Sequence, residues 1–213
     1  MSARSRLICC VSCIALLVLA ACNPAPPAAG AGSKASSNAK VPAGAKSSGG
    51  LHAIIETDKG GIELEFFPAD APKGVENFRL LAEHNYYDGL TLHRIVKGFM
   101  LQGGDPMGNG TGGESAWGGE FADEINPGSP LYQAGYKRGI VAYANRGPNT
   151  NGSQFFIMHN DYPLDPSYVI FAKVVGGFDV IDAIANTPTT MGDDGNMSRP
   201  LTPVIIKKVT IKP

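Results

Sequence analysis

Alternating hydrophobic and polar positions run through much of the chain after residue 50 and predict β-strands there. In residues 62–66, Ile-Glu-Leu-Glu-Phe, apolar and acidic side chains alternate, which is the period of a strand with one face in water. Residues 51–57 form an apolar strand before it, and Asp-Lys-Gly-Gly at 58–61 predicts a hairpin turn between the two. Further strands are expected at residues 92–95, 100–102, 140–144, 154–158, 169–175 and 203–211.

Two segments have helical spacing instead. Asp-Ala-Pro at 70–72 predicts a helix start, since proline is tolerated in the first turn, and apolar residues then recur at helical spacing up to Asn85. A second, shorter helix is expected at residues 179–186. Many short strands with turns between them and only two helices predict a mainly β fold, a closed antiparallel β-barrel with helices over its ends.

The first 50 residues have a different composition. Arg4 and Arg6 precede an apolar run at 7–19 that small residues follow, which is the pattern of an export signal; the run is short for a transmembrane helix. The segment after residue 22 is rich in Ala, Pro, Gly, Ser and Lys and has no aromatic residue before Leu51, so it predicts a disordered tether. We therefore expect a signal peptide at 1–21, a tether at 22–50 and one folded domain at 51–213.

Charge and cysteine content narrow the function classes. None of the 19 acidic residues and only five of the 18 basic residues precede Leu51, so the predicted domain has a formal net charge of −6. An acidic domain without a basic stripe argues against nucleic acid as a partner. All four cysteines lie at or before Cys22, so the domain has no disulfide framework and no thiolate ligand. The histidines lack metal-ligand spacing, and we expect neither a metal nor a cofactor.

Two motif-rich segments flank a glycine-rich loop in the middle of the chain. Residues 92–105 are Leu-His-Arg-Ile-Val-Lys-Gly-Phe-Met-Leu-Gln-Gly-Gly-Asp, and residues 143–156 are Tyr-Ala-Asn-Arg-Gly-Pro-Asn-Thr-Asn-Gly-Ser-Gln-Phe-Phe. Gly-Thr-Gly-Gly lies between them at 110–113, without the Gly-Lys-Ser/Thr of a phosphate-binding loop. These segments resemble the signatures of the cyclophilins, a family of peptidyl-prolyl cis-trans isomerases, and the resemblance covers residues 51–213. It implies an eight-stranded closed barrel capped by two α-helices and an enzyme that acts on proline-containing polypeptides.

The implied reaction is rotation about an X–Pro amide bond, which is slow because resonance gives the bond double-bond character. It needs a proline pocket, contacts that hold the flanking backbone and a hydrogen-bond donor near the twisted amide. The nitrogen of the twisted amide regains its lone pair and can accept that hydrogen bond. The resemblance assigns the donor to Arg94, a permanently charged side chain with several donors in one plane. It assigns Gln102 a contact with the substrate backbone near Arg94. A structural hydrogen bond to a loop is the alternative for Gln102, and both roles are compatible if Gln102 also orients Arg94.

The resemblance also assigns the substrate-binding residues. Phe99, Met100 and Phe156 match the proline pocket, with Leu164 as a further wall, although apolar residues in strands are ordinarily core. The remaining matches are His93, Ala144, Asn145, Gln154 and Tyr168. Asn145 is expected to pair with the peptide through its main chain. For His93, a packed, hydrogen-bonded histidine is an equally good interpretation.

The chain departs from the family pattern in two places. Family members that bind cyclosporin tightly have a Trp shortly before a Leu-Asp pair, whereas residues 160–165 here contain none, so weak cyclosporin binding is expected. Tyr168 replaces a histidine that is often found beyond that pair.

The segment 125–138 is longer than in compact family members and is expected to protrude as a loop. The Asp-Asp-Gly-Asn at 193–196 falls short of a calcium loop and is expected to be a solvated turn.

Leu-Ala-Ala-Cys at 19–22 resembles the bacterial lipobox. This resemblance implies a mature chain that begins at Cys22 and carries lipid there, anchored to a membrane and facing the periplasm. Asn23 favours the outer membrane over the inner one; an ordinary cleavable signal is the rival interpretation. Two functions remain open. The first is a tethered, monomeric isomerase that speeds the folding of exported proteins. The second is a tethered module or chaperone that binds proline-containing peptides with little catalysis.

Overall fold

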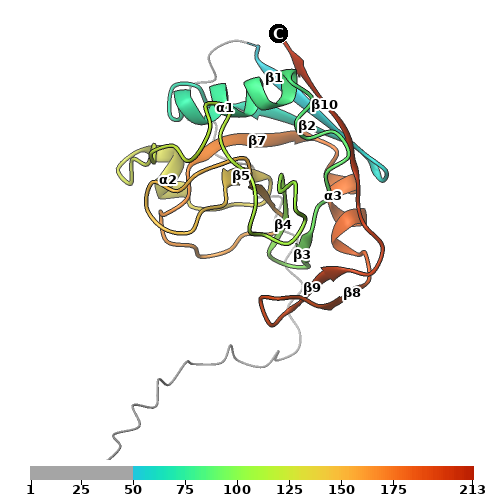
Figure 1. Ribbon diagram of the computed structural model, residues 1–213. Helices are drawn as coiled ribbons and strands as arrows, with labels where there is room; N and C mark the ends of the chain where they lie inside the picture. Colours follow the sequence, from blue (N-terminus) through green and yellow to red (C-terminus); the bar gives the residue numbers. More distant parts are fainter. Residues whose placement is uncertain (1–49) are drawn as a thin grey trace, which may run out of the picture. The chain divides into compact units, whose positions relative to one another are not determined.

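The computed structural model describes residues 50–213, which fold into one large sheet, a small hairpin and three helices. The eight-stranded sheet has the order β10-β1-β2-β7-β5-β6-β4-β3, and every neighbouring pair is antiparallel (Figure 1). Its strands are β1 (His52–Thr57), β2 (Gly60–Phe66), β3 (Arg94–Val96), β4 (Met100–Gly103), β5 (Ile140–Tyr143), β6 (Phe155–Met158), β7 (Ile170–Gly176) and β10 (Ile206–Lys212). Each overlaps a segment that the sequence predicts as a strand.

The sheet is an open, curled half-barrel, so the expectation of a closed barrel is wrong. Its end strands, β3 and β10, do not form a ladder with each other. The segments next to these strands pair locally instead. Thr91 and Ile205 form an isolated bridge, and hydrogen bonds run from Leu92 N to Val204 O at 2.9 Å, from Ile206 N to Leu90 O at 2.8 Å and from Gly89 N to Ile206 O at 2.8 Å.

The helix α1 (Pro72–Glu83) packs against β7 and β10 and closes the core beneath it. Phe78 on α1 is fully buried, with its ring centroid 4.9 Å from that of Tyr87, 5.3 Å from that of Phe171 and 5.5 Å from that of Phe155. Tilted and edge-on aromatic pairs at these distances add to the hydrophobic stabilisation of the core. A second predicted helix is confirmed as α3 (Phe178–Ala185), which lies against β2 and β4.

A third helix, α2 (Pro130–Ala134), lies in the segment that was expected to protrude as a loop. Ser129 caps it by accepting a hydrogen bond of 3.4 Å from Tyr132 N. Leu131 and Tyr132 on the helix and Tyr136 after it are buried. The expectations of a protruding loop and of two helices are therefore wrong, because this segment folds back and buries its own apolar side chains.

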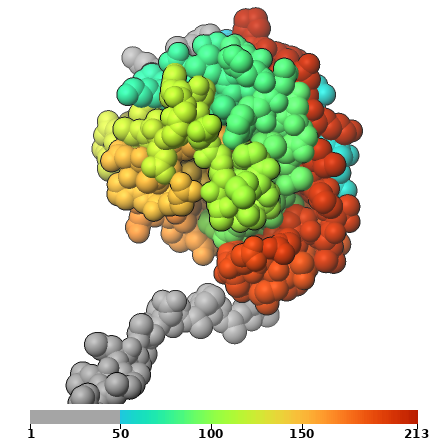
Figure 2. Space-filling view, in the orientation of Figure 1, coloured from blue at the N-terminus to red at the C-terminus, as the bar shows by residue number. Residues whose placement is uncertain are grey.

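A short hairpin, β8 (Thr189–Met191) and β9 (Met197–Pro200), precedes β10 and was not predicted. Its turn contains Asp194, is closed by a hydrogen bond of 2.7 Å from Gly192 N to Asn196 O, and uses a positive φ of 73° at Gly195. In Figure 2 the hairpin, in red, lies beside the glycine-rich loop, in yellow-green.

Within residues 50–213, no helix is long and apolar enough to cross a membrane. The predicted signal peptide and the tether before Gly50 lie outside the described residues.

Candidate active site

Strand pairing brings three of the predicted site residues into one row across the sheet. Arg94 on β3 is directly opposite Gln102 on β4, and Gln102 is directly opposite Phe156 on β6. Residues opposite each other on paired strands have side chains on the same face of the sheet. Two segments that are more than 50 positions apart in sequence therefore present these side chains together.

An apolar pocket lies beside this row. Its wall is formed by Phe99, Met100, Phe156, Leu164 and Tyr168, and its rim by Arg94, Gln102, Ala144 and Asn145. The rings of Phe156 and Tyr168 pack edge to face, with centroids 5.4 Å apart and planes at 89°. Phe99 packs against the half-exposed ring of Tyr162 at 4.4 Å, an aromatic contact that the sequence did not predict.

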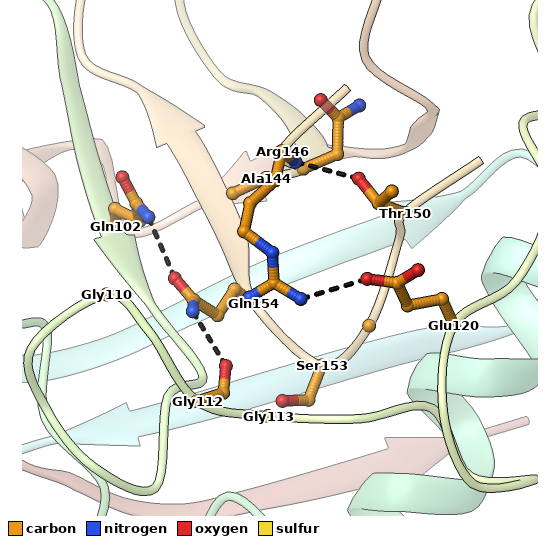
Figure 3. A pocket seen from close by; sticks show the side chains of 12 residues that line it. Gln102, Gly110, Gly112, Gly113, Glu120, Ala144, Arg146, Thr150, Ser153 and Gln154 are labelled. Atoms are coloured by element: carbon orange, nitrogen blue, oxygen red, sulfur yellow. Dashed lines mark hydrogen bonds and ion pairs between the residues drawn. The ribbon is translucent and has the colours of Figure 1, made fainter. Parts of the chain in front are cut away.

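A chain of side-chain hydrogen bonds leads away from Arg94 across the groove. Arg94 Nη1 donates to Gln102 Oε1 at 3.3 Å, Gln102 Nε2 donates to Gln154 Oε1 at 2.9 Å, and Gln154 Nε2 donates to Gly112 O at 2.8 Å. Figure 3 shows the last two bonds. Because each amide is oriented by the next, Gln102 presents its carbonyl oxygen to Arg94. Gln102 thus bonds to two side chains, those of Arg94 and Gln154, while Gln154 makes the bond to the loop; Gln102 also lines the pocket.

The guanidinium group of Arg94 is held from a second direction by Asp194. Arg94 Nε donates to Asp194 Oδ2 at 2.7 Å, and Arg94 Cζ lies 6.0 Å from the ring centroid of Phe99. Partial burial by itself raises the pKa of Asp194, but hydrogen bonds from Ser198 and Arg94 outweigh it and hold the pKa well below its ordinary value. The sequence did not connect Asp194 with Arg94: it showed a turn rich in Asp and Gly but not the side chain that this turn would meet.

A buried carboxylate, Asp105, organises the glycine-rich loop. Asp105 accepts backbone hydrogen bonds from Met107 at 2.8 Å, Asn109 at 3.0 Å and Gly110 at 2.6 Å. Burial acts to raise the pKa of Asp105, but these N–H groups outweigh it and the pKa lies below its ordinary value. The loop begins at Gly104, which has a φ of +85° and no room for a side chain beside the main-chain oxygen of Ser153. The glycines thus shape a wall of the groove.

A second, more polar pocket continues the groove on the far side of Gln102 (Figure 3). It shares Gln102, Ala144 and Asn145 with the apolar pocket and adds Gln154, among others. An ion pair of 2.9 Å between Arg146 Nη2 and Glu120 Oε1 lies on its rim. All of the predicted residues on this side, Ala144, Asn145 and Gln154, therefore line one continuous groove.

Asn145 and His93 differ in where their side chains lie. Asn145 Nδ2 donates to Ser167 O at 2.8 Å, and the Asn145 main-chain groups have no hydrogen-bond partner within residues 50–213. His93 does not line the apolar pocket; it faces an adjoining cavity between the glycine-rich loop and the β8–β9 hairpin. Neither of its ring nitrogens has a hydrogen-bond partner in the described part of the chain. Burial lowers the pKa of His93, Asp105 opposes this and Arg94 adds to it, so the ring is neutral at pH 7.

The protein is thus an open β half-barrel with an apolar pocket, an arginine on the rim of that pocket and a polar groove beside it, which is an arrangement suited to binding a peptide. Residues 52–211 match the family described as "Cyclophilin type peptidyl-prolyl cis-trans isomerase/CLD". The chain belongs to the cyclophilin family and is a cyclophilin-type peptidyl-prolyl cis-trans isomerase.

Relatives and solved structures agree with this assignment. The chain is 48% identical to peptidyl-prolyl cis-trans isomerase CYP18-1 of Arabidopsis thaliana over 162 residues, which cover 76% of this chain and 96% of that protein. It is 45% identical to the human peptidyl-prolyl cis-trans isomerase-like 3, with the same two coverages of 76% and 96%. A crystal structure of a cyclophilin type peptidyl-prolyl cis-trans isomerase from Cryptosporidium parvum is 39% identical, with a TM-score of 0.68 and coverage of 76% of this chain and 96% of that chain. A second structure of that protein, with a TM-score of 0.68 and 39% identity over 75% of this chain and 98% of that one, was determined in the presence of the dipeptide Ala-Pro.

Proposed function

We propose that this isomerase speeds X–Pro rotation by directing the guanidinium group of Arg94 at the nitrogen of the twisted amide. The observation that carries the proposal is the position of Arg94 on the rim of an apolar pocket, with two of its three nitrogens already bonded to the protein. Nη2 has no hydrogen-bond partner within residues 50–213 and is the nitrogen left for the substrate.

The chemistry of the bond explains why one donor is enough. In the planar amide the nitrogen lone pair is delocalised into the carbonyl group, and this resonance creates the barrier of roughly 18–20 kcal/mol. In the twisted state the lone pair returns to the nitrogen, which becomes a hydrogen-bond acceptor. A donor aimed at that nitrogen therefore binds the twisted state more strongly than either planar state, which lowers the barrier.

The two pockets supply the binding that this step needs. The wall formed by Phe99, Met100, Phe156, Leu164 and Tyr168 is proposed to hold the proline ring. The unpaired main-chain groups of Asn145 are proposed to bond to the peptide backbone before the proline, as an added strand would. Holding the peptide on both sides of one bond leaves rotation about that bond as the remaining motion.

Exchange spectroscopy on a short Ala-Pro peptide tests this proposal. The full chain, purified in detergent, should accelerate cis–trans exchange, and Arg94→Ala should lower the rate at saturating peptide by ~10²–10³-fold, the loss typical of removing one transition-state donor. Peptide affinity should change little, because the apolar wall is intact. Binding without acceleration by the wild-type chain would leave a proline-peptide binding module instead.

We further propose that the chain is exported and lipid-anchored through Cys22, facing the periplasm, and that it serves the folding of exported proteins there as a monomer. The support is the basic, apolar and small-residue order of residues 4–22 and the tether composition that follows. The mass of the mature N-terminus tests it: a diacylglycerol-modified Cys22 in the wild-type chain, absent from Cys22→Ser, is the expected result. An unmodified N-terminus after an Ala-x-Ala cleavage would contradict the anchor.

A further inference from the structure

The β8–β9 hairpin places the carboxylate of Asp194 against Arg94, 100 positions away in sequence. The two side chains form an ion pair of 2.7 Å between Arg94 Nε and Asp194 Oδ2, with 30% and 25% of their side-chain surfaces exposed. Charged hydrogen bonds of this length are directional as well as attractive. Asp194 lines the cavity between the hairpin and the glycine-rich loop, and it does not line the apolar pocket.

The hairpin turn fixes Asp194 through its other oxygen. Asp194 Oδ1 accepts a hydrogen bond of 2.6 Å from Ser198 Oγ and one of 3.1 Å from Asn196 N. Ser198 is itself buried, with 2% of its surface exposed. One carboxylate oxygen is thus held by the hairpin and the other by Arg94, so the position of the hairpin determines the position of the guanidinium group.

The consequence for Arg94 follows from the planarity of its guanidinium group. Asp194 takes the Nε–H group and Gln102 accepts from Nη1 at 3.3 Å. Two bonds on two different nitrogens of a rigid plane define the orientation of the whole plane. The direction in which the free Nη2 points is therefore set by Asp194 and Gln102 together.

We propose that Asp194 is a positioning residue for the isomerisation and that it orients Arg94 towards the twisted amide without touching the substrate. This inference rests on the proposed catalytic role of Arg94. The carboxylate has two opposed effects on catalysis: it holds the guanidinium plane, and its negative charge weakens Arg94 as a donor. We assign the larger effect to orientation, because a donor that is misplaced by about 1 Å loses far more rate than a partly neutralised one.

Exchange kinetics of Asp194→Ala separate these two effects. The rate at saturating peptide should fall by ~10-fold while KM stays within ~2-fold of the wild-type value, because the peptide-binding surfaces are unchanged. Asp193→Ala is the matched control: it removes the same charge from the same turn, but Asp193 pairs with Arg199 at 2.6 Å and not with Arg94. The control should keep the wild-type rate. A faster Asp194→Ala enzyme, or an equal loss in both variants, would overturn the proposal.

Two further variants guard against a merely structural effect. Asp194→Asn can keep an amide oxygen towards Arg94 Nε, so it should recover part of the lost rate even if the Asp194→Ala hairpin is distorted. In an Arg94→Ala background, Asp194→Ala should produce no further loss, because Asp194 would then have nothing to orient. Additional loss in that background would contradict the positioning role.

A spectroscopic readout completes the test. The Nε–H proton of Arg94 should give a slowly exchanging signal in the wild-type chain and in Asp193→Ala, and a fast-exchanging one in Asp194→Ala. Loss of this signal without loss of rate would refute the inference and leave the proposed role of Arg94 standing. If Arg94→Ala itself kept the full rate, the proposed function would fail first, and that outcome is visible without any Asp194 variant.

Discussion

At the scale of single residues, Gln102 has the most connected position in the groove. It accepts a hydrogen bond from Arg94, donates one to Gln154 and lines both pockets. A side chain that contacts the proposed donor on one side and the peptide groove on the other affects both orientation and binding.

We predict that Gln102→Ala lowers the exchange rate at saturating peptide by ~10-fold, because Arg94 Nη1 loses its acceptor while Asp194 still holds Nε. Peptide affinity should also weaken, since the groove loses one wall. Exchange spectroscopy and a peptide titration measure the two effects. Gln133→Ala, at an exposed position on α2, is the control and should match the wild-type chain. An unchanged rate in Gln102→Ala would show that Gln102 does not orient Arg94 for catalysis.

The residues that the sequence could and could not identify differ in a physical way. Arg94, Gln102 and Phe156 could be identified because the motifs that contain them resemble the family's signature segments, and the strand register then places the three side chains in one row. Asp194 could not, since its partner is 100 positions away and only the packing of two loops brings them together. Asp105 was missed for a different reason: its partners are the backbone N–H groups of its own loop, which have no sequence signature.

At the scale of elements, α2 and the segment after it support the wall of the apolar pocket. The Tyr136 hydroxyl donates to Tyr168 O at 2.9 Å and accepts from Tyr168 N at 3.1 Å, and the Tyr132 hydroxyl lies 3.2 Å from the same oxygen. Burial raises the pKa of Tyr136 to about 12, so its hydroxyl stays protonated and can donate throughout the neutral range. The two tyrosines thus fix the main chain at Tyr168.

We predict that Tyr136→Phe destabilises the fold by ~1–3 kcal/mol, because Tyr168 N loses its partner and Tyr168 O loses one of two partners in a partly buried place. KM should rise as well, since Tyr168 is a wall of the pocket. Urea denaturation and exchange kinetics provide the two measurements. Tyr162→Phe removes the same atom from a half-exposed tyrosine beside the pocket and should change neither. A stable Tyr136→Phe chain with the wild-type KM would show that α2 does not support the site.

Element prediction succeeded for long, regular patterns and failed for short ones. The alternating residues of β2 and the helical spacing of α1 were sufficient to predict both. The five residues of α2 are too few to show helical spacing, and β8 and β9 are held by each other and by neighbouring β3 rather than by a pattern of their own. The length of the 125–138 segment alone predicts a protrusion, whereas in the structure Tyr132 and Tyr136 of this segment are buried.

At the scale of the whole molecule, the sheet order follows from pairing that sequence patterns do not contain. The sequence predicts the eight strands of the large sheet, but their order and the open seam between β3 and β10 depend on which distant segments pair, and no strand pattern contains that information. His159, a partly buried residue, connects three parts of the molecule. Its Nδ1 accepts from Gly98 N at 2.9 Å, and its Nε2 lies 3.3 Å from Asp182 Oδ1 on α3.

We predict that the chain is less stable in weak acid than at neutral pH. Burial lowers the pKa of His159 from its ordinary value of 6.5, Arg138 adds to this and Asp182 opposes it. A histidine with a depressed folded-state pKa contributes stability above the unfolded-state pKa, and this contribution is lost as the pH falls through the folded-state pKa. The urea midpoint should drop between about pH 7.5 and about pH 5.5, and His159→Gln should reduce that drop. His84→Gln, at an exposed position, should leave the drop unchanged, and an equal drop in His159→Gln would contradict the assignment.

The central claim, that an oriented guanidinium group at position 94 acts on the twisted amide, is tested most directly by Arg94→Lys. Lysine keeps the positive charge but not the planar group that bonds to Asp194 and Gln102 at once. Catalysed exchange at saturating Ala-Pro peptide should fall by ~10-fold or more while the peptide Kd stays within ~2-fold of the wild-type value. An Arg94→Lys chain with the wild-type exchange rate would show that charge alone suffices and would contradict the account.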